Sequence, residues 1–234
     1  TSRKRRNKMI LEVCANSYES AINAENGGAH RIELCENLSV GGLTPNFELA
    51  KKVINELNIP VFILIRPRDG DFNYSNEEFE KIKKDIILFK DLGCKGIVSG
   101  ILTKDKNIDI KKTKELIELS RPLEFTFHRA FDEVNNPKEA LNQLVELKAD
   151  RILTSGQEKT AIEGIEMIKK LAVLSKNKIK IMPGSGINSA NIIEFTKLDI
   201  NEIHGSFSKQ EENNKSISNI NMIMNCVKLI NDCK

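Results

Sequence analysis

The feature of this sequence that most limits its fold is a regular alternation between short apolar runs and longer amphipathic segments. Each run has the length and composition of a buried β-strand, and each is followed by a segment with helical periodicity. One strand and its helix together take roughly 25 to 30 residues, which is typical of parallel βα units. The predicted strands are residues 9–14, 31–35, 60–65, 96–100, 123–128, 150–154, 179–182 and 202–205.

Eight βα units in 234 residues predict an α/β fold of one domain, a (β/α)8 TIM barrel over residues 9–234. An open doubly wound sheet is the alternative. No GxGxxG motif follows the first strand, which argues against that alternative and against a nucleotide cofactor. Residues 1–8 predict a flexible basic tail. Residues 159–174 are expected to be helical, and residues 208–216 to lack regular structure.

Composition and charge exclude several classes of protein. The net charge of +3 is too close to zero to indicate a nucleic-acid partner. No apolar run approaches the roughly 20 residues of a membrane helix, and no secretory signal is visible. The five cysteines include no CxxC pair, which argues against a disulfide framework. We therefore expect a protein of the reducing cytoplasm, without a membrane partner.

The third predicted strand ends in a charged loop, RPRDGD at residues 66–71. Building a core does not require four charges at this point, and a loop at the carboxyl end of a parallel strand commonly faces a ligand. Arg66 and Arg68 are therefore candidates for binding an anion, with Asp71 beside them. The alternative is internal pairing of these two arginines, and of Arg129, with Asp69, Asp71, Asp132 or the two inward glutamates.

Polar residues recur on one face of several predicted strands. Strand residues alternate faces, and the apolar face of a barrel strand packs against helices, so the polar face points inward. Buried charges are costly unless they are paired, and a group of them at one end of a barrel indicates a functional site. The residues predicted to point inward are Glu12, Cys14, Glu33, Cys35, Arg66, Thr126, His128, Thr154, Glu202, His204 and Ser206.

Acid–base chemistry and anion binding are both suggested by these strand ends. A histidine titrates near neutrality, so His128 is a candidate general acid or base; a core histidine bonded to a carbonyl is the alternative. Glycine-rich loops after the last three strands are typical of phosphate binding in barrels, although tight turns also require glycine. The candidate catalytic residues are Glu12, Glu33, His128, Asp132 and His204. The candidate anion-binding residues are Arg66, Arg68, Asp71, Arg129, Ser155, Gly156, Gly184, Gly186 and Ser206.

Two cysteines form a candidate metal site. Cys14 and Cys35 end adjacent predicted strands on the inward face. Two soft thiolates side by side suit Cu(I). The alternative is simple packing, because cysteine is a common small buried residue.

Several long motifs carry a resemblance to a known family. They are LEVCANSYESAINAENGGAHRIELCENLSVGGLTP, IRPRDGDFNYS, FTFHRAFD, RILTSGQ and IMPGSGI. Over residues 9–206 the chain resembles the CutC family of copper homeostasis proteins. The resemblance implies a (β/α)8 barrel, a cytoplasmic homodimer, and Cu(I) bound at positions matching Cys14 and Cys35. The chain departs from the family pattern at Asp69, where glycine is more usual, and at residues 204–207, which read HGSF.

The two interpretations predict different ligands. The first is a copper homeostasis protein that binds or traffics Cu(I). The alternative is a TIM-barrel enzyme that acts on a small anionic substrate, such as a phosphorylated one, by general acid–base chemistry at the carboxyl-terminal mouth of the barrel. In that alternative the arginines and glycine-rich loops bind the anion, which a copper carrier does not need.

Overall fold

The predicted alternation of strands and helices is present throughout the computed structural model, which describes residues 8–210 and 216–233. Each of the eight predicted barrel strands is found, with ends that differ by at most one residue. The strands are β1 (Ile10–Ala15), β2 (Arg31–Leu34), β3 (Val61–Leu64), β4 (Gly96–Ser99), β5 (Glu124–Phe127), β6 (Arg151–Thr154), β7 (Lys180–Pro183) and β8 (Glu202–Gly205).

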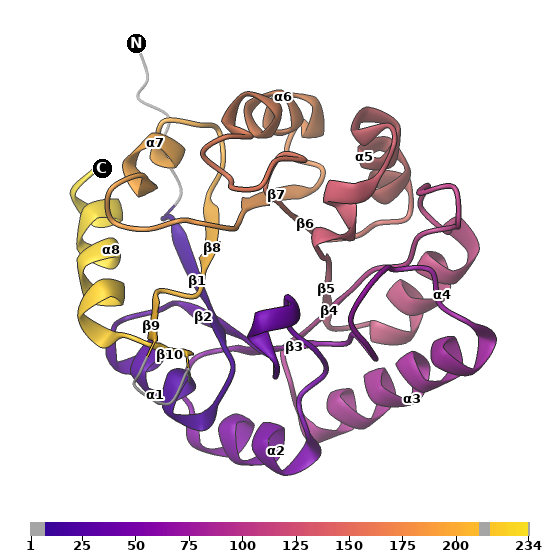
Figure 1. Cartoon of the computed structure of the whole chain (residues 1–234), viewed down its shortest axis with the longest axis horizontal. Helices are drawn as coiled ribbons and strands as arrows, with labels where there is room; N and C mark the ends of the chain where they lie inside the picture. Colours follow the sequence, from indigo (N-terminus) through magenta and orange to yellow (C-terminus); the bar gives the residue numbers. More distant parts are fainter. Residues whose placement is uncertain (1–7, 211–215, 234) are drawn as a thin grey trace.

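Helices follow the strands and form the outer ring (Figure 1). All of them except the sixth and the seventh begin after a capping side chain: Ser17 accepts a hydrogen bond from the Ser20 N–H, and Ser75 forms a capping box with Glu78 before the longest helix. The helices are α1 (Tyr18–Asn26), α2 (Phe47–Glu56), α3 (Asn76–Leu92), α4 (Ile110–Ser120), α5 (Pro137–Glu146), α6 (Ile165–Ser175), α7 (Ile192–Thr196) and α8 (Ile220–Asp232), with 3-10 turns η1 (Leu38–Val40) and η2 (Arg129–Glu133).

The strands form a parallel barrel. They are hydrogen-bonded in the order β7-β6-β5-β4-β3-β2-β1-β8, and β7 and β8 approach each other to bring the two ends of the sheet together (Figure 1). The (β/α)8 barrel is therefore confirmed as the fold of a single domain. The register pairs Glu12 of β1 with Arg31 of β2 and with His204 of β8. These three polar residues consequently meet inside the barrel.

The apolar faces of the strands supply the core between the barrel and its helices. Leu11, Val13, Ile32, Leu34 and Ile203 are fully buried there, on the face opposite to the polar residues. This burial of apolar surface is the main force that holds the two layers together. The polar face is left to fill the barrel interior.

Two segments differ from the sequence-based expectation. Helix α6 begins at Ile165 rather than near residue 159, and the residues before it form turns. Gly164 lies against the backbone of Ser155 and Gly156, where a side chain on Gly164 would clash. Within residues 208–216, expected to be irregular, Ser208–Gln210 forms strand β9, which pairs antiparallel with β10 (Ser216–Ser218). Of the predicted basic tail, residues 1–7 lie outside the described residues, and Lys8 is exposed.

Candidate functional site in the barrel interior

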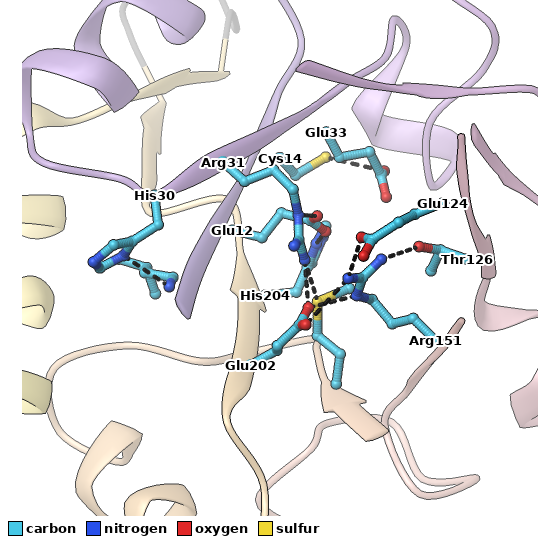
Figure 2. Close-up of polar contacts among 12 residues, drawn as sticks. Glu12, Cys14, His30, Arg31, Glu33, Glu124, Thr126, Arg151, Glu202 and His204 are labelled. Atoms are coloured by element: carbon cyan, nitrogen blue, oxygen red, sulfur yellow. Dashed lines mark hydrogen bonds and ion pairs between the residues drawn. The ribbon is translucent and has the colours of Figure 1, made fainter. Parts of the chain in front are cut away.

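A network of ion pairs fills the amino-terminal half of the barrel interior (Figure 2). Arg31 pairs with Glu12, and its Nη2 lies 2.6 Å from Oε2 of Glu202. Arg151, which is fully buried, also pairs with Glu202, and its Nη2 lies 2.8 Å from Oε2 of Glu124. Opposite charges therefore compensate each other across β1, β2, β5, β6 and β8, and the hydrogen-bonded geometry is the kind that buried charges require.

The pKa values of this network follow from the pairing. Burial acts to raise the pKa of Glu202, but the hydrogen bond and charge of Arg151 outweigh it and hold the pKa at about 2. Burial likewise acts to raise the pKa of Glu12, and Arg31 and His204 bring it far below the ordinary value. Both carboxylates are consequently ionised at neutral pH.

Glu12 connects this network to a second cluster nearer the mouth. Its Oε1 lies 2.8 Å from Nδ1 of His204. The Cys14 Sγ lies 3.6 Å from Sγ of Cys35 and 3.8 Å from Oε1 of Glu33. One potential ligand atom from each of Cys14, Glu33 and His204 falls within 4.8 Å of the others. The sequence-predicted residues of β1, β2 and β8 are thus brought together.

Burial perturbs the protonation of this cluster. The hydrogen bond with Cys35, together with burial, raises the pKa of the Cys14 thiol well above its usual value. Burial raises the pKa of Glu33 to about 7. For His204, burial acts to lower the pKa, but hydrogen bonds to Cys14 and Glu12 raise it well above the ordinary value. The free cluster therefore holds protons that a bound cation would displace.

The donor set suits a soft metal ion. Two cysteine sulfurs and an imidazole nitrogen are ligands for Cu(I) and Zn²⁺ rather than for Mg²⁺ or Ca²⁺. Glu12 occupies Nδ1 of His204 and so fixes the ring with its other nitrogen available, the arrangement that commonly supports a metal-bound histidine. Gly42 lies over Cys35, and a side chain there would come within 3.4 Å of its sulfur. The residues present therefore fit a copper ion.

Above this cluster, a cavity of about 480 Å³ opens at the carboxyl-terminal ends of the strands. Turn η1 and the loops after β3, β5, β7 and β8 contribute to its walls. The sequence-predicted site residues that line it are Cys14, Glu33, Arg66, His128, Arg129, Asp132, Gly186, His204 and Ser206. The predicted residues outside the lining are Glu12, Cys35, Arg68, Asp71, Ser155, Gly156 and Gly184.

His128 stands at the end of β5 as a neutral imidazole. Its Nδ1 accepts a hydrogen bond from the Ala130 N–H at 3.2 Å, which caps η2. Burial, reinforced by the nearby charge of Arg66, lowers the pKa of His128 to about 3. The proton of the neutral ring is therefore on Nε2, a buried atom for which the described residues supply no hydrogen-bond partner. General acid–base catalysis by this residue stays a prediction.

Arg66 holds loops together. Its Nη1 donates to the carbonyls of Val40 (2.7 Å) and Gly42 (3.0 Å), and its Nη2 donates to the carbonyl of Gly70 (3.0 Å). The guanidinium also lies over the Phe72 ring, 5.1 Å from its centroid. Its Nε has no partner among the described residues. Arg66 thus donates three of its five N–H groups to carbonyls, and its Nε–H is left without a partner in the described chain.

Arg68 and Asp71 lie together at the rim. Arg68 pairs with Asp71 at 3.0 Å and with Glu78 at 2.5 Å, and it stacks over the ring of Tyr74. Both partners of the Arg68–Asp71 pair are partly solvent-exposed. The internal pairing that the sequence left open as an alternative is the arrangement found here.

The loop after β6 already binds a carboxylate side chain of the protein, that of Asp132. Asp132 accepts hydrogen bonds from the backbone N–H groups of Ser155 and Gln157 and from the hydroxyls of Thr154 and Ser155. Arg129 pairs with the same carboxylate at 2.8 Å. The Ser155 N–H, predicted to bind an external anion, is therefore taken by this carboxylate, and the Gly156 N–H donates to the Thr154 hydroxyl instead.

The last two glycine-rich loops have mixed roles. The Gly184 N–H donates to the carbonyl of Thr154, and a side chain on Gly184 would lie 2.6 Å from Leu153. Gly184 thus permits close packing of β7 on β6. Gly186 adopts a φ of 70°, which glycine tolerates, and it reaches the cavity wall together with Ser206.

Sequence reasoning missed Arg31 and Arg151 as residues of the interior. Arg31 lies two residues before Glu33 on the same strand face, so the alternation could have found it. Arg151 lies two residues before Leu153, and the prediction that Thr154 rather than Leu153 points inward on this strand is wrong, because Leu153 lines the cavity. The position of Arg151 could not be predicted from this apolar strand alone, because its ion pair with Glu202 is seen only in the structure.

Comparison with known proteins places this barrel in a family. Residues 9–209 match the model of the CutC family. This chain belongs to the CutC family. A human relative named copper homeostasis protein cutC homolog is 49% identical over 186 residues, which are 80% of this chain and 68% of the relative. The CutC family protein of Pasteurella multocida is 46% identical over 197 residues, covering 84% of this chain and 81% of that protein.

A solved structure agrees with the sequence relatives. The crystal structure of a putative copper homeostasis protein CutC from Streptococcus agalactiae superposes with a TM-score of 0.80 at 32% identity, covering 85% of this chain and 98% of that one. Family and fold are therefore supported independently. Among the described residues, no helix is both long and apolar enough to cross a membrane.

Proposed function

We propose that this CutC chain binds Cu(I) inside the barrel mouth through Cys14, Cys35 and His204, and that it serves copper homeostasis. The observation that carries the proposal is the convergence of ligand atoms from Cys14, Glu33 and His204 within 4.8 Å of one another, with the Cys35 sulfur 3.6 Å from that of Cys14. The relatives named for copper homeostasis support the same assignment.

The electrostatics of the cluster favour a cation. Glu12 and Glu33 place two carboxylates beside the ligands, and Arg31 is compensated by Glu12 and Glu202. The objection that nearby arginines repel a cation therefore loses most of its force at this point of the barrel. Thiolates formed on binding add negative charge next to the ion.

Binding must release protons. Because the pKa of Cys14 is raised by its hydrogen bond with Cys35 and by burial, its thiol is protonated in the metal-free protein, and the pKa of His204 is raised by Cys14 and Glu12. Cu(I) affinity should consequently increase with pH, since each displaced proton is a competitor.

The test is an anaerobic competition titration against a chromophoric Cu(I) chelator. We expect the Cys14→Ser/Cys35→Ser double variant to lose at least about a hundredfold in affinity, because the oxygens that replace the sulfurs are poor ligands for a soft ion. The matched control is Cys94→Ser/Cys226→Ser, which changes two other buried cysteines. Equal affinities for the wild type and the Cys14/Cys35 variant contradict the proposal.

A second variant tests the orienting carboxylate. Glu12→Gln removes the charge that holds Nδ1 of His204 and should weaken Cu(I) binding by about 10- to 100-fold while both sulfurs remain. Because Glu12 also pairs with Arg31, the fold of this variant is checked by circular dichroism first.

Location and assembly belong to the same proposal. All five cysteines are free, although two of their sulfurs lie only 3.6 Å apart, which supports a reducing cytoplasm. Cell fractionation against compartment markers tests this. The homodimer implied by the family resemblance stays a prediction, and sedimentation velocity of the copper-free protein tests it.

A further inference from the structure

Copper binding leaves one side of the mouth unexplained. Arg66 is only 6% exposed, and no carboxylate of the described chain forms an ion pair with it. Its guanidinium bonds only to carbonyl oxygens, so its positive charge stays uncompensated in a poorly solvated position. A buried cation without a counter-ion is costly, and a Cu(I) site gives no reason to keep one.

His128 adds a second donor to the same side. Its Nδ1 and Cε1 lie against Gly100, where an added Cβ would be 2.7 Å and 2.8 Å from them. The opposite edge of the ring carries Cδ2 and Nε2, and His128 contributes to the lining of the cavity. The Nε2–H group has no partner in the described chain. A fixed neutral imidazole with an unused N–H is a ready donor to an oxygen atom.

The charges that act on His128 separate it from the metal cluster. After burial, Arg66 is the charged group that lowers the pKa of His128, whereas the charges that act on the pKa of Glu33, again after burial, are those of His204, Glu12 and Arg31. The cavity thus has a copper corner at Cys14, Glu33 and His204, and a second corner at Arg66 and His128. Of the other carboxylates in the lining, Asp132 pairs with Arg129 and accepts from the β6 loop, and Glu133 pairs with Lys106.

The cavity is also larger than an ion requires. Its volume of about 480 Å³ falls in the range of small-molecule sites, roughly 300 to 1,000 Å³. Val40, Leu64 and Phe72 give it an apolar wall, and Phe72 touches both donor residues: it lies under the Arg66 guanidinium and 4.8 Å from the His128 ring. A ligand with a charged end and a short carbon skeleton matches these surfaces.

We propose that the mouth binds a small organic oxyanion, a carboxylate or a phosphate ester, independently of copper. Its charged oxygens lie at Nε2 of His128 and Nε of Arg66, and its carbon skeleton packs on Val40 and Leu64. The bound anion supplies the counter-charge that Arg66 lacks within the described chain. The mouth then accommodates a soft cation and an organic anion in adjacent corners.

The test uses copper-free wild-type protein labelled with 15N-histidine. The chain has three histidines, so each imidazole can be assigned. Pyruvate serves as the carboxylate probe and glycerol 3-phosphate as the phosphate-ester probe, each titrated at constant ionic strength. We expect at least one of them to shift the Nε2 resonance of His128 saturably, with a Kd of about 1 mM or tighter. Which probe saturates at the lower concentration identifies the anion class.

Two variants make the result specific. His128→Asn keeps a side chain that can cap η2 but withdraws the Nε2 donor, and it should weaken binding of the active probe by at least about tenfold, as measured by calorimetry. The matched control is His30→Asn. His30 lies well apart from the interior cluster, with its Nδ1 accepting from the Leu11 N–H, and its variant should bind the probe as the wild type does (Figure 2).

The proposal is overturned if neither probe shifts the His128 resonance up to 20 times the expected Kd, about 20 mM. It is also overturned if His128→Asn binds the active probe as tightly as the wild type. If that variant does not fold, the wild-type titration alone decides. Because no copper is present, failure of the copper proposal leaves the outcome of this experiment unchanged.

Discussion

At the amino-terminal end of the barrel interior, Arg31 and Arg151 lie between carboxylates, and each charged group of that network has a partner. At the carboxyl-terminal end, Glu33, Arg66 and His128 are equally buried, yet each keeps one polar atom without a partner in the described chain. One end of the barrel interior therefore has polar groups that are all paired, and the other end has polar groups that lack partners. The two ends are separated by the length of a short strand.

The difference indicates what each end is for. A fully paired network maintains the shape of the interior, and its loss appears as lost stability. A buried polar atom without a partner costs about 1–3 kcal/mol, so a cluster of them persists where a ligand completes the bonding. The pairing of the amino-terminal network therefore indicates a structural role, and the unpartnered atoms at the mouth support the proposed binding site, in agreement with the general polarity of barrels.

The largest expected loss of stability comes from disrupting the ion-pair network at the amino-terminal end of the barrel interior. Arg151→Met removes a fully buried guanidinium and leaves Glu202 and Glu124 without it. The free energy of unfolding should fall by about 3–5 kcal/mol, because an uncompensated charge remains inside. Urea denaturation followed by circular dichroism measures it.

The control for that variant is Lys180→Met. Lys180 pairs with the same two carboxylates at 3.2 Å, but its side chain is 41% exposed. Its loss should cost no more than about 1 kcal/mol, as for surface pairs. Equal losses for the two variants would show that the buried network carries no special share of the stability.

The next effect concerns pH. The two ends of the barrel interior should change the free energy of unfolding in opposite directions as the pH rises. Glu33 has its pKa raised by burial from 4.5 to about 7, so the folded state holds that proton more tightly than the unfolded state. The contribution of Glu33 to the free energy of unfolding is therefore greatest below pH 4.5, and it is lost as the pH rises to about 7. For Glu202, with a pKa of about 2 set by Arg151 against burial, the contribution is present above pH 4.5 and is lost as the pH falls.

Glu33→Gln tests this contrast. Stability of the wild type should decline between pH 4.5 and 7 by an amount on the order of 3 kcal/mol from Glu33, and the variant should lose that decline. The rise in stability between about pH 2 and 4.5 should remain in both proteins, since Glu202 is intact. Identical profiles above pH 4.5 would assign the decline to other groups, and His204 is the first to examine.

The smallest effect concerns the loop after β6, where the carboxylate of Asp132 already accepts the available hydrogen bonds. Asp132→Asn keeps one acceptor oxygen but loses the charge that binds Arg129 and the Ser155 N–H. We expect a loss of about 1–2 kcal/mol, measured by thermal unfolding. Asp71→Asn at the exposed rim is the control and should change stability by less than about 0.5 kcal/mol. An unchanged stability of Asp132→Asn would show that the charge of Asp132 does not stabilise the loop after β6.

Much of this arrangement was predictable because it depends on local periodicity. The length and spacing of the apolar runs located all eight strands to within one residue, and alternation placed Glu12, Cys14 and His204 on the inner face. Alternation failed on β6, where Leu153 rather than Thr154 faces inward, because one polar residue beside a loop was a weak guide to the face.

The sequence by itself determined the barrel, the inward set of polar residues and the proximity of Cys14 to Cys35, since adjacent parallel strands must bring neighbouring ends together. Only the tertiary structure decided how those residues divide between structure and binding. Arg151 meets Glu202 across 51 positions of the chain, and Asp132 rather than an external anion accepts from the Ser155 N–H after β6. Pairing of this kind depends on how the barrel closes and how its strands are staggered, which no local pattern in the chain encodes.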